Sequence, residues 1–101
     1  MKAASLEQVR SSIDQIDRKI VALVTERETW VREAARFKTT RSEVEAPARV
    51  EQVIAKVRSL AEDSGGSPEV VERLYRAMIA AFIDLEHAER NRSAQHPTEE
   101  E

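Results

Sequence analysis

A seven-residue repeat of apolar residues, in a long segment without glycine or proline, constrains the fold of this chain most. Apolar residues recur at two positions of each heptad, which is typical of a seam along a helix. One position holds Leu6, Ile13, Ile20 and Ala34, and the other holds Val9, Ile16, Leu23, Trp30 and Phe37. The segment from about Ser5 to Thr39 is rich in good helix formers, and Ser5 is placed to cap it. The sequence therefore predicts one long helix over these residues.

The length of this helix predicts a second copy of the chain. At 1.5 Å per residue the segment spans about 50 Å. A compact domain of this size has a radius of gyration of about 13 Å. The rest of the chain is too short to cover the seam, so we expect an intertwined homodimer.

Two shorter helices are expected in the second half of the chain. Pro47 is typical of a first helical turn and starts a helix that runs to about Glu62. Two glycines then break the helix, and Ser67 followed by Pro68 indicates an N-cap and a second first-turn proline. The third helix runs to about Arg90. The fold class predicted is therefore all-α, with one long and two shorter helices per chain.

The polar stretch 39–46 is expected to be a loop. Beyond Asn91 the sequence is polar and acidic, so we expect a helical domain over residues 1–90 and a disordered tail over residues 91–101.

Composition excludes several classes of function. The formal net charge of −3 argues against nucleic acid as the main partner. The chain has no cysteine and only two histidines, which argues against thiolate chemistry and a transition-metal site. No stretch approaches the roughly 18 apolar residues of a membrane span, so we expect a cytoplasmic protein without a membrane partner.

Arg27 occupies a position of the heptad seam at which an apolar residue is expected. Burying a guanidinium group is costly without an anionic partner, and no acidic residue lies on the seam. Arg27 therefore predicts a bound anion. The alternative is that it specifies the register of a coiled coil.

Three further cations are candidates for the same anion. On a continuous helix Lys38 is rotated about 20° from Arg27 and lies roughly 16 Å along the axis, which suits a small, elongated polyanion. Arg10 lies about 25 Å from Arg27 on another face, so it would act only from a partner chain. Arg49, in the first turn of the second helix, is the fourth candidate. Solvent exposure or pairing with neighbouring acids is the alternative for Lys38, Arg10 and Arg49.

Glu86 continues the apolar stripe of the third helix and points a carboxyl group toward the interior. Burial favours the protonated form, which donates a hydrogen bond. The alternative is an exposed residue at a frayed helix end.

Several motifs together resemble the all-helical class of chorismate mutases over about residues 5–90. The most specific is an Arg-x-x-Ile-Asp-x-Ile-Asp pattern that starts at Arg10. The resemblance is carried by Val9–Asp17, the Glu26-Arg27 pair, Ala35–Lys38, Arg49 and Val71–Tyr75.

The resemblance implies an intertwined dimer with two equivalent sites. Arg10 would be contributed by the other chain, and Arg27 would be the main carboxylate anchor. Lys38 would contact the ether oxygen and a carboxylate, and Arg49 would hold the ring end. Glu86 falls where bacterial members usually have Gln, whereas a Glu there resembles the eukaryotic mutases.

The activity implied is the rearrangement of chorismate to prephenate by a concerted [3,3] shift. This reaction needs no cofactor, metal or nucleophile. The enzyme holds the dianion in its reactive conformer and stabilises charge on the breaking ether oxygen. Lys38 and Glu86 would be the catalytic residues.

Two positions depart from the usual mutase pattern. Ala46 and Val50 replace acidic residues that contact the ring hydroxyl. The segment from Ala46 to Val50 resembles the isochorismate-pyruvate lyase branch, whose members release salicylate and pyruvate. That activity, or a mutase acting on a substituted chorismate such as an amino-chorismate, is the first alternative to chorismate mutase. The second is a helical dimer without activity, which fold resemblance alone does not exclude.

Overall fold

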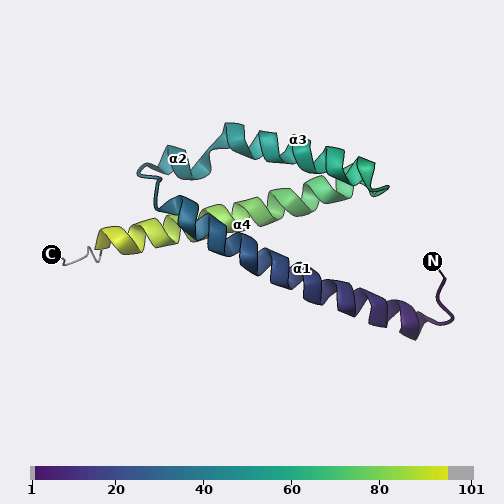
Figure 1. The fold of residues 1–101 in the computed structure, drawn as a ribbon. Helices are drawn as coiled ribbons and strands as arrows, with labels where there is room; N and C mark the ends of the chain where they lie inside the picture. Colours follow the sequence, from purple (N-terminus) through teal and green to yellow (C-terminus); the bar gives the residue numbers. More distant parts are fainter. Residues whose placement is uncertain (1, 96–101) are drawn as a thin grey trace. The chain divides into compact units, whose positions relative to one another are not determined.

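The computed structural model describes residues 2–95, and this part of the chain is helical and contains no strand. Its helices are α1 (Leu6–Ala35), α2 (Arg41–Glu45), α3 (Pro47–Asp63) and α4 (Pro68–Gln95) (Figure 1). The all-α class is confirmed, and the three helices expected from the sequence correspond to α1, α3 and α4; α4, with 28 residues, is nearly as long as α1, with 30. The chain divides into two units, residues 1–31 and residues 32–101. No described helix is long and apolar enough to cross a membrane.

The apolar seam of α1 is exposed in the single chain. Ser5 caps the helix as expected, because its Oγ accepts a hydrogen bond of 3.1 Å from the backbone N–H of Gln8. The helix has no buried residue. The exposed fractions lie between 40% and 65% for Leu6, Val9, Ile13, Ile16, Ile20, Leu23 and Trp30. The chain by itself therefore leaves the seam in contact with solvent.

The first helix ends at Ala35, so the expectation that it runs to Thr39 was wrong. Its last turn tightens, because the N–H groups of Arg36, Phe37 and Lys38 bond to carbonyls three residues back, at 3.0–3.2 Å. Thr40 is then extended and caps the next helix. Lys38 therefore lies beyond α1, and the 20° offset from Arg27 that assumed a continuous helix does not apply.

A short helix, α2, occupies most of the stretch that was expected to be a loop. A capping box starts it: Thr40 Oγ1 accepts from the Glu43 N–H, and Glu43 Oε1 accepts from the Thr40 N–H, both at 3.1 Å. Val44 then buries its side chain to 2% exposure, and α2 packs on α4. Ala46 links α2 to α3 with a φ of 35°, in the left-handed region.

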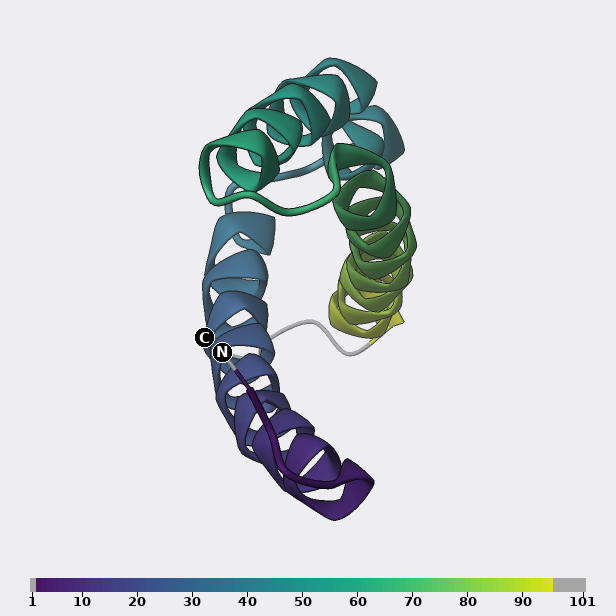
Figure 2. The ribbon, with the colours of Figure 1, turned by 90° about the vertical axis from the view of Figure 1, so that its right-hand side faces the viewer.

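Helices α3 and α4 lie side by side and form the core of the second unit (Figure 1). The loop that joins them is visible in Figure 2 and contains Gly65 with a φ of 80°. Ser67 caps α4 as expected, accepting from the Val70 N–H at 3.3 Å. The buried apolar residues are Val44 from α2, Ile54, Val57 and Ala61 from α3, and Ile79 and Phe82 from α4.

The fourth helix continues to Gln95, past the expected end at Arg90. Residues 91–95 include Arg92, Ala94 and Gln95, which are good helix formers, so the helix has no local reason to stop at Asn91. The rest of the expected acidic tail, residues 96–101, lies outside the described residues.

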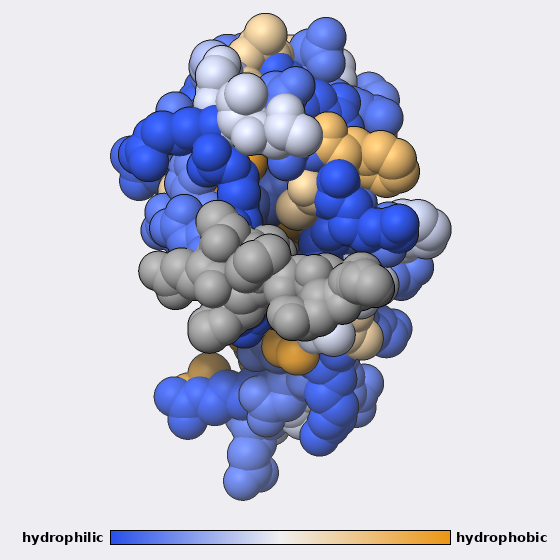
Figure 3. Space-filling view, turned by 90° about the vertical axis from the view of Figure 1, so that its left-hand side faces the viewer, coloured by the Kyte–Doolittle hydropathy of each residue, from blue (hydrophilic) through white to orange (hydrophobic). Residues whose placement is uncertain are grey.

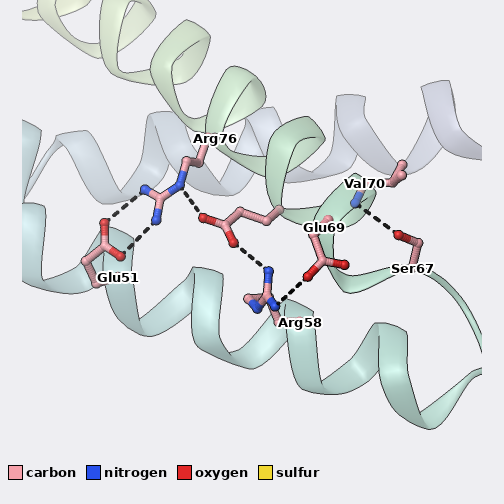
Figure 4. Close-up of polar contacts among 7 residues, drawn as sticks. Glu51, Arg58, Ser67, Glu69, Val70 and Arg76 are labelled. Carbon is pink, nitrogen blue, oxygen red and sulfur yellow. Dashed lines mark hydrogen bonds and ion pairs between the residues drawn. The ribbon is translucent and has the colours of Figure 1, made fainter.

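A ladder of ion pairs joins α3 to α4 on their surface (Figure 4). Arg76 on α4 donates two hydrogen bonds of 2.9 Å to Glu51 on α3, and its Nε donates one of 2.7 Å to Glu72. Arg58 on α3 donates to Glu72 at 2.7 Å and to Glu69 at 3.2 Å. These guanidinium groups lower the pKa of Glu51 and Glu72. The ladder links the middle of α3 to the first turns of α4, the helix that carries Glu86.

Candidate functional site

Glu86 is the only buried charged residue in the described part of the chain, with 4% of its surface exposed. It lies on α4, where it continues the face of Ile79 and Phe82 toward the interior. Lys38, in the turn after α1, reaches it: Lys38 Nζ donates to Glu86 Oε2 at 2.9 Å. A buried carboxylate requires a partner of this kind, because an unpaired buried charge is costly. The structure thus brings together the two residues that the sequence predicted to be catalytic.

A cavity of about 260 Å³ surrounds this pair. All of its lining residues belong to the second unit, and they come from the end of α1, the following turn, α2 and α4. They are Arg32, Ala35, Arg36, Lys38, Val44, Glu86, Glu89 and Arg90. Four are cations and two are carboxylates, so the lining carries an excess of positive charge. This is the charge balance that a small dianion requires.

A second ion pair lies in the wall of the cavity, between Arg32 and Glu89. Glu89 also accepts a hydrogen bond of 2.7 Å from Arg92, and this bond is the main reason that the pKa of Glu89 is lowered. Glu89 is therefore ionised at neutral pH. The guanidinium of Arg36 pairs with Glu33. On the face drawn in Figure 3, the coloured surface is mostly hydrophilic, with small, separate hydrophobic patches.

Sequence reasoning missed several residues of the cavity. It did not identify Arg32, Arg36, Glu89 or Arg90. One signal was present: Glu89 and Arg90 follow Glu86 by three and four residues, which places all three on one face of a helix. The pairing of Arg32 with Glu89 joins residues that are 57 positions apart, so no local pattern predicts it.

The other predicted site residues lie elsewhere in the chain. Arg10 is exposed and Arg27 is half-buried, both on α1 within the first unit. Arg49 is exposed in the first turn of α3 and does not line the cavity. The roles expected for these three arginines stay predictions.

Comparison with known proteins identifies relatives over most of the chain. The profile of the family described as "Chorismate mutase type II" matches residues 9–87. The isochorismate pyruvate lyase of Pseudomonas aeruginosa is 33% identical over 78 residues, which cover 77% of this chain and 77% of that protein. The family match includes the turn that carries Lys38.

Proposed function

The chain belongs to the chorismate mutase type II family, as its sequence motifs predicted, and from this premise we propose that it rearranges chorismate to prephenate in the cavity around Lys38 and Glu86. The observation that carries the proposal is the 2.9 Å contact between these two residues inside a cavity with excess positive charge. Chorismate carries two carboxylates and a breaking ether bond. The cavity offers cations for the former and hydrogen-bond donors for the latter.

Lys38 serves two partners at once in this proposal. An ammonium group has three N–H donors, so a bond to Glu86 leaves two for the ether oxygen and a carboxylate of the substrate. Glu86 holds the ammonium in place before substrate binds. The rearrangement is concerted, so catalysis consists of holding the reactive conformer and stabilising negative charge on the ether oxygen. When Glu86 is protonated, it donates a second hydrogen bond to that oxygen.

The arginines on other parts of the chain complete the proposed site. Arg27 anchors a substrate carboxylate, and Arg49 holds the ring end. Arg10 comes from a second copy of the chain. The exposed apolar seam of α1 supports this homodimer, because a partner helix would remove it from water. The cytoplasmic location and the absence of a nucleic-acid partner also stay predictions.

Isochorismate-pyruvate lyase activity is the second candidate. It is favoured by the relative from Pseudomonas aeruginosa, which carries that name. It is also favoured by Ala46 and Val50, both half-buried, which stand where usual mutases have acidic residues for the ring hydroxyl. A mutase that acts on a substituted chorismate is the third candidate, and Ala46 and Val50 favour it in the same way.

One pair of assays tests the proposal. Chorismate consumption is followed by absorbance, and salicylate release from isochorismate is followed by fluorescence. We expect the first activity, and we expect Lys38→Ala to lower kcat/KM by at least about a hundredfold. Lys56→Ala, the same change at an exposed lysine of α3, serves as the matched control and should leave the rate unchanged. Salicylate release without chorismate consumption would show that the protein is a lyase and not a mutase. A lack of activity on both acids would contradict both proposed activities.

A further inference from the structure

The cations of the cavity differ in whether a carboxylate already neutralises them. Lys38 is paired with Glu86, Arg32 with Glu89, and Arg36 with Glu33. An anion that binds to any of these three must compete with the carboxylate already in place, or share the cation with it. Such competition lowers the affinity gained from each contact.

Arg90 is the exception among the cavity's cations. It lines the cavity and is half-buried, yet it forms no hydrogen bond or ion pair with any of residues 2–92, whose side chains the structure describes. A half-buried guanidinium group has lost part of its hydration, and Arg90 gains no partner among residues 2–92 in exchange, which is unfavourable. An incoming carboxylate would correct this without breaking a pair formed within residues 2–92.

The position of Arg90 on α4 directs it to the same site as the catalytic pair. It follows Glu86 by four residues, so the two lie on one face of the helix, rotated by about 40° from each other. Helix α4 continues past Arg90 to Gln95, so the backbone of Arg90 has helical geometry. Arg90 lies beyond residues 9–87, over which the family profile matches, so it is a feature of this chain that the family match does not assign.

We propose that Arg90 is a substrate-binding residue that takes one carboxylate of the dianion held in the cavity. A guanidinium group presents a planar pair of N–H donors that matches the two oxygens of a carboxylate. Arg90 therefore contributes ground-state binding and orientation, and Lys38 contributes to the reacting end. The identity of the dianion as a chorismate-type acid rests on the proposed function, whereas the binding of a dicarboxylate does not.

Steady-state kinetics separate this role from a structural one. We expect Arg90→Ala to raise KM for the ring acid about tenfold or more, with kcat changed by less than about threefold, because the contact is made equally before and during the reaction. Arg90→Lys keeps the charge but loses the planar fork, and should recover part of the affinity. Arg73→Ala, which removes an exposed arginine of the same helix away from the cavity, is the matched control and should change neither constant.

A binding experiment makes the proposal independent of turnover. Isothermal titration calorimetry with isophthalate, a stable ring dicarboxylate, should give a dissociation constant about tenfold weaker for Arg90→Ala than for the wild type or Arg73→Ala. The melting temperature of each variant shows whether it is folded, and Arg90→Gln replaces Arg90→Ala if the latter is not.

The two proposals fail in different ways. Isophthalate binding that depends on Arg90, in a protein that turns over neither ring acid, would overturn the proposed function and uphold the role of Arg90. Turnover that depends on Lys38 while Arg90→Ala leaves both KM and isophthalate affinity unchanged would overturn the role of Arg90 alone.

Discussion

Lys38 and Glu86 are 48 residues apart in the chain, yet the Lys38 ammonium lies 2.9 Å from the Glu86 carboxylate. The lysine comes from the turn that ends α1, and the glutamate comes from the buried face of α4. Glu86 is 4% exposed, so the pair is shielded from water on the side of the carboxylate. The contact gives Lys38 a fixed position in the cavity, and it gives Glu86 the charge partner that its burial demands.

The same pair predicts an effect on stability. Lys38→Met removes the partner of a buried carboxylate and should lower the free energy of unfolding by about 1–3 kcal/mol. This loss is smaller than the loss expected when a fully buried ion pair is broken, because the side chain of Lys38 is 26% exposed. The double variant Lys38→Met/Glu86→Gln removes the orphaned charge and should regain most of the loss. Urea unfolding at fixed protein concentration measures this, and additive losses in the double variant would argue against the pairing.

Local sequence signals predicted the helices well where a cap or a first-turn proline marks an end. Pro47, Ser5 and Ser67 all perform the roles expected of them, and α3 ends within one residue of the expected Glu62. The end of α1 was misplaced because Phe37 continues the heptad pattern, although the chain has already left the helix. Periodicity reports which residues are apolar, and it does not report where backbone hydrogen bonding changes.

The site was only partly predictable for a similar reason. Lys38 and Glu86 are recognisable because each stands in a motif or on an apolar face. Arg32 and Glu89 become neighbours only when the end of α1 meets α4, and nothing local to either residue indicates that contact. Arg90 was expected at the end of a helix, and no local pattern indicates that its side chain lines a cavity. Residues that gain meaning only from long-range packing require the structure.

Ala46 predicts a substitution that stabilises the protein. It adopts a φ of 35°, in a region that costs a residue with a side chain about 1–2 kcal/mol and costs glycine little. Ala46→Gly should raise the free energy of unfolding by about 0.5–1 kcal/mol, after the entropy that glycine gains in the unfolded chain is subtracted. Urea unfolding of this variant beside Ala48→Gly, a helical control that should be destabilised, checks it. Equal destabilisation of both variants would show that the link is not strained.

The ion-pair ladder between α3 and α4 predicts sensitivity to acid. Arg76 lowers the pKa of Glu51 and Glu72 from 4.5, their ordinary value. Acids with lowered pKa values stabilise the fold above that ordinary value, and this contribution is lost as the pH falls through the lowered values. The melting temperature of the wild type should therefore drop below about pH 4.5. Arg76→Gln should lower the melting temperature near neutral pH, and the melting temperature of this variant should fall less steeply below pH 4.5 than that of the wild type. The exposed control Arg73→Gln should show the same fall as the wild type. If the melting temperatures of Arg76→Gln and the wild type fell in parallel with pH, the ion-pair ladder would not be the cause of the acid sensitivity.

The homodimer with shared sites predicts complementation between two inactive variants. Arg10→Ala chains lack the arginine lent to the partner, and Lys38→Ala chains lack the lysine of their own site. A mixed dimer holds one site with both defects and one site with neither. Random reassembly of equal amounts makes half of the dimers mixed, so about a quarter of wild-type activity should return. Unfolding and refolding the mixture, with each variant treated alone as control, provides the measurement. Mixed dimers that form, as judged by mass-tagged chains, and yet recover no turnover would place Arg10 outside the partner's site.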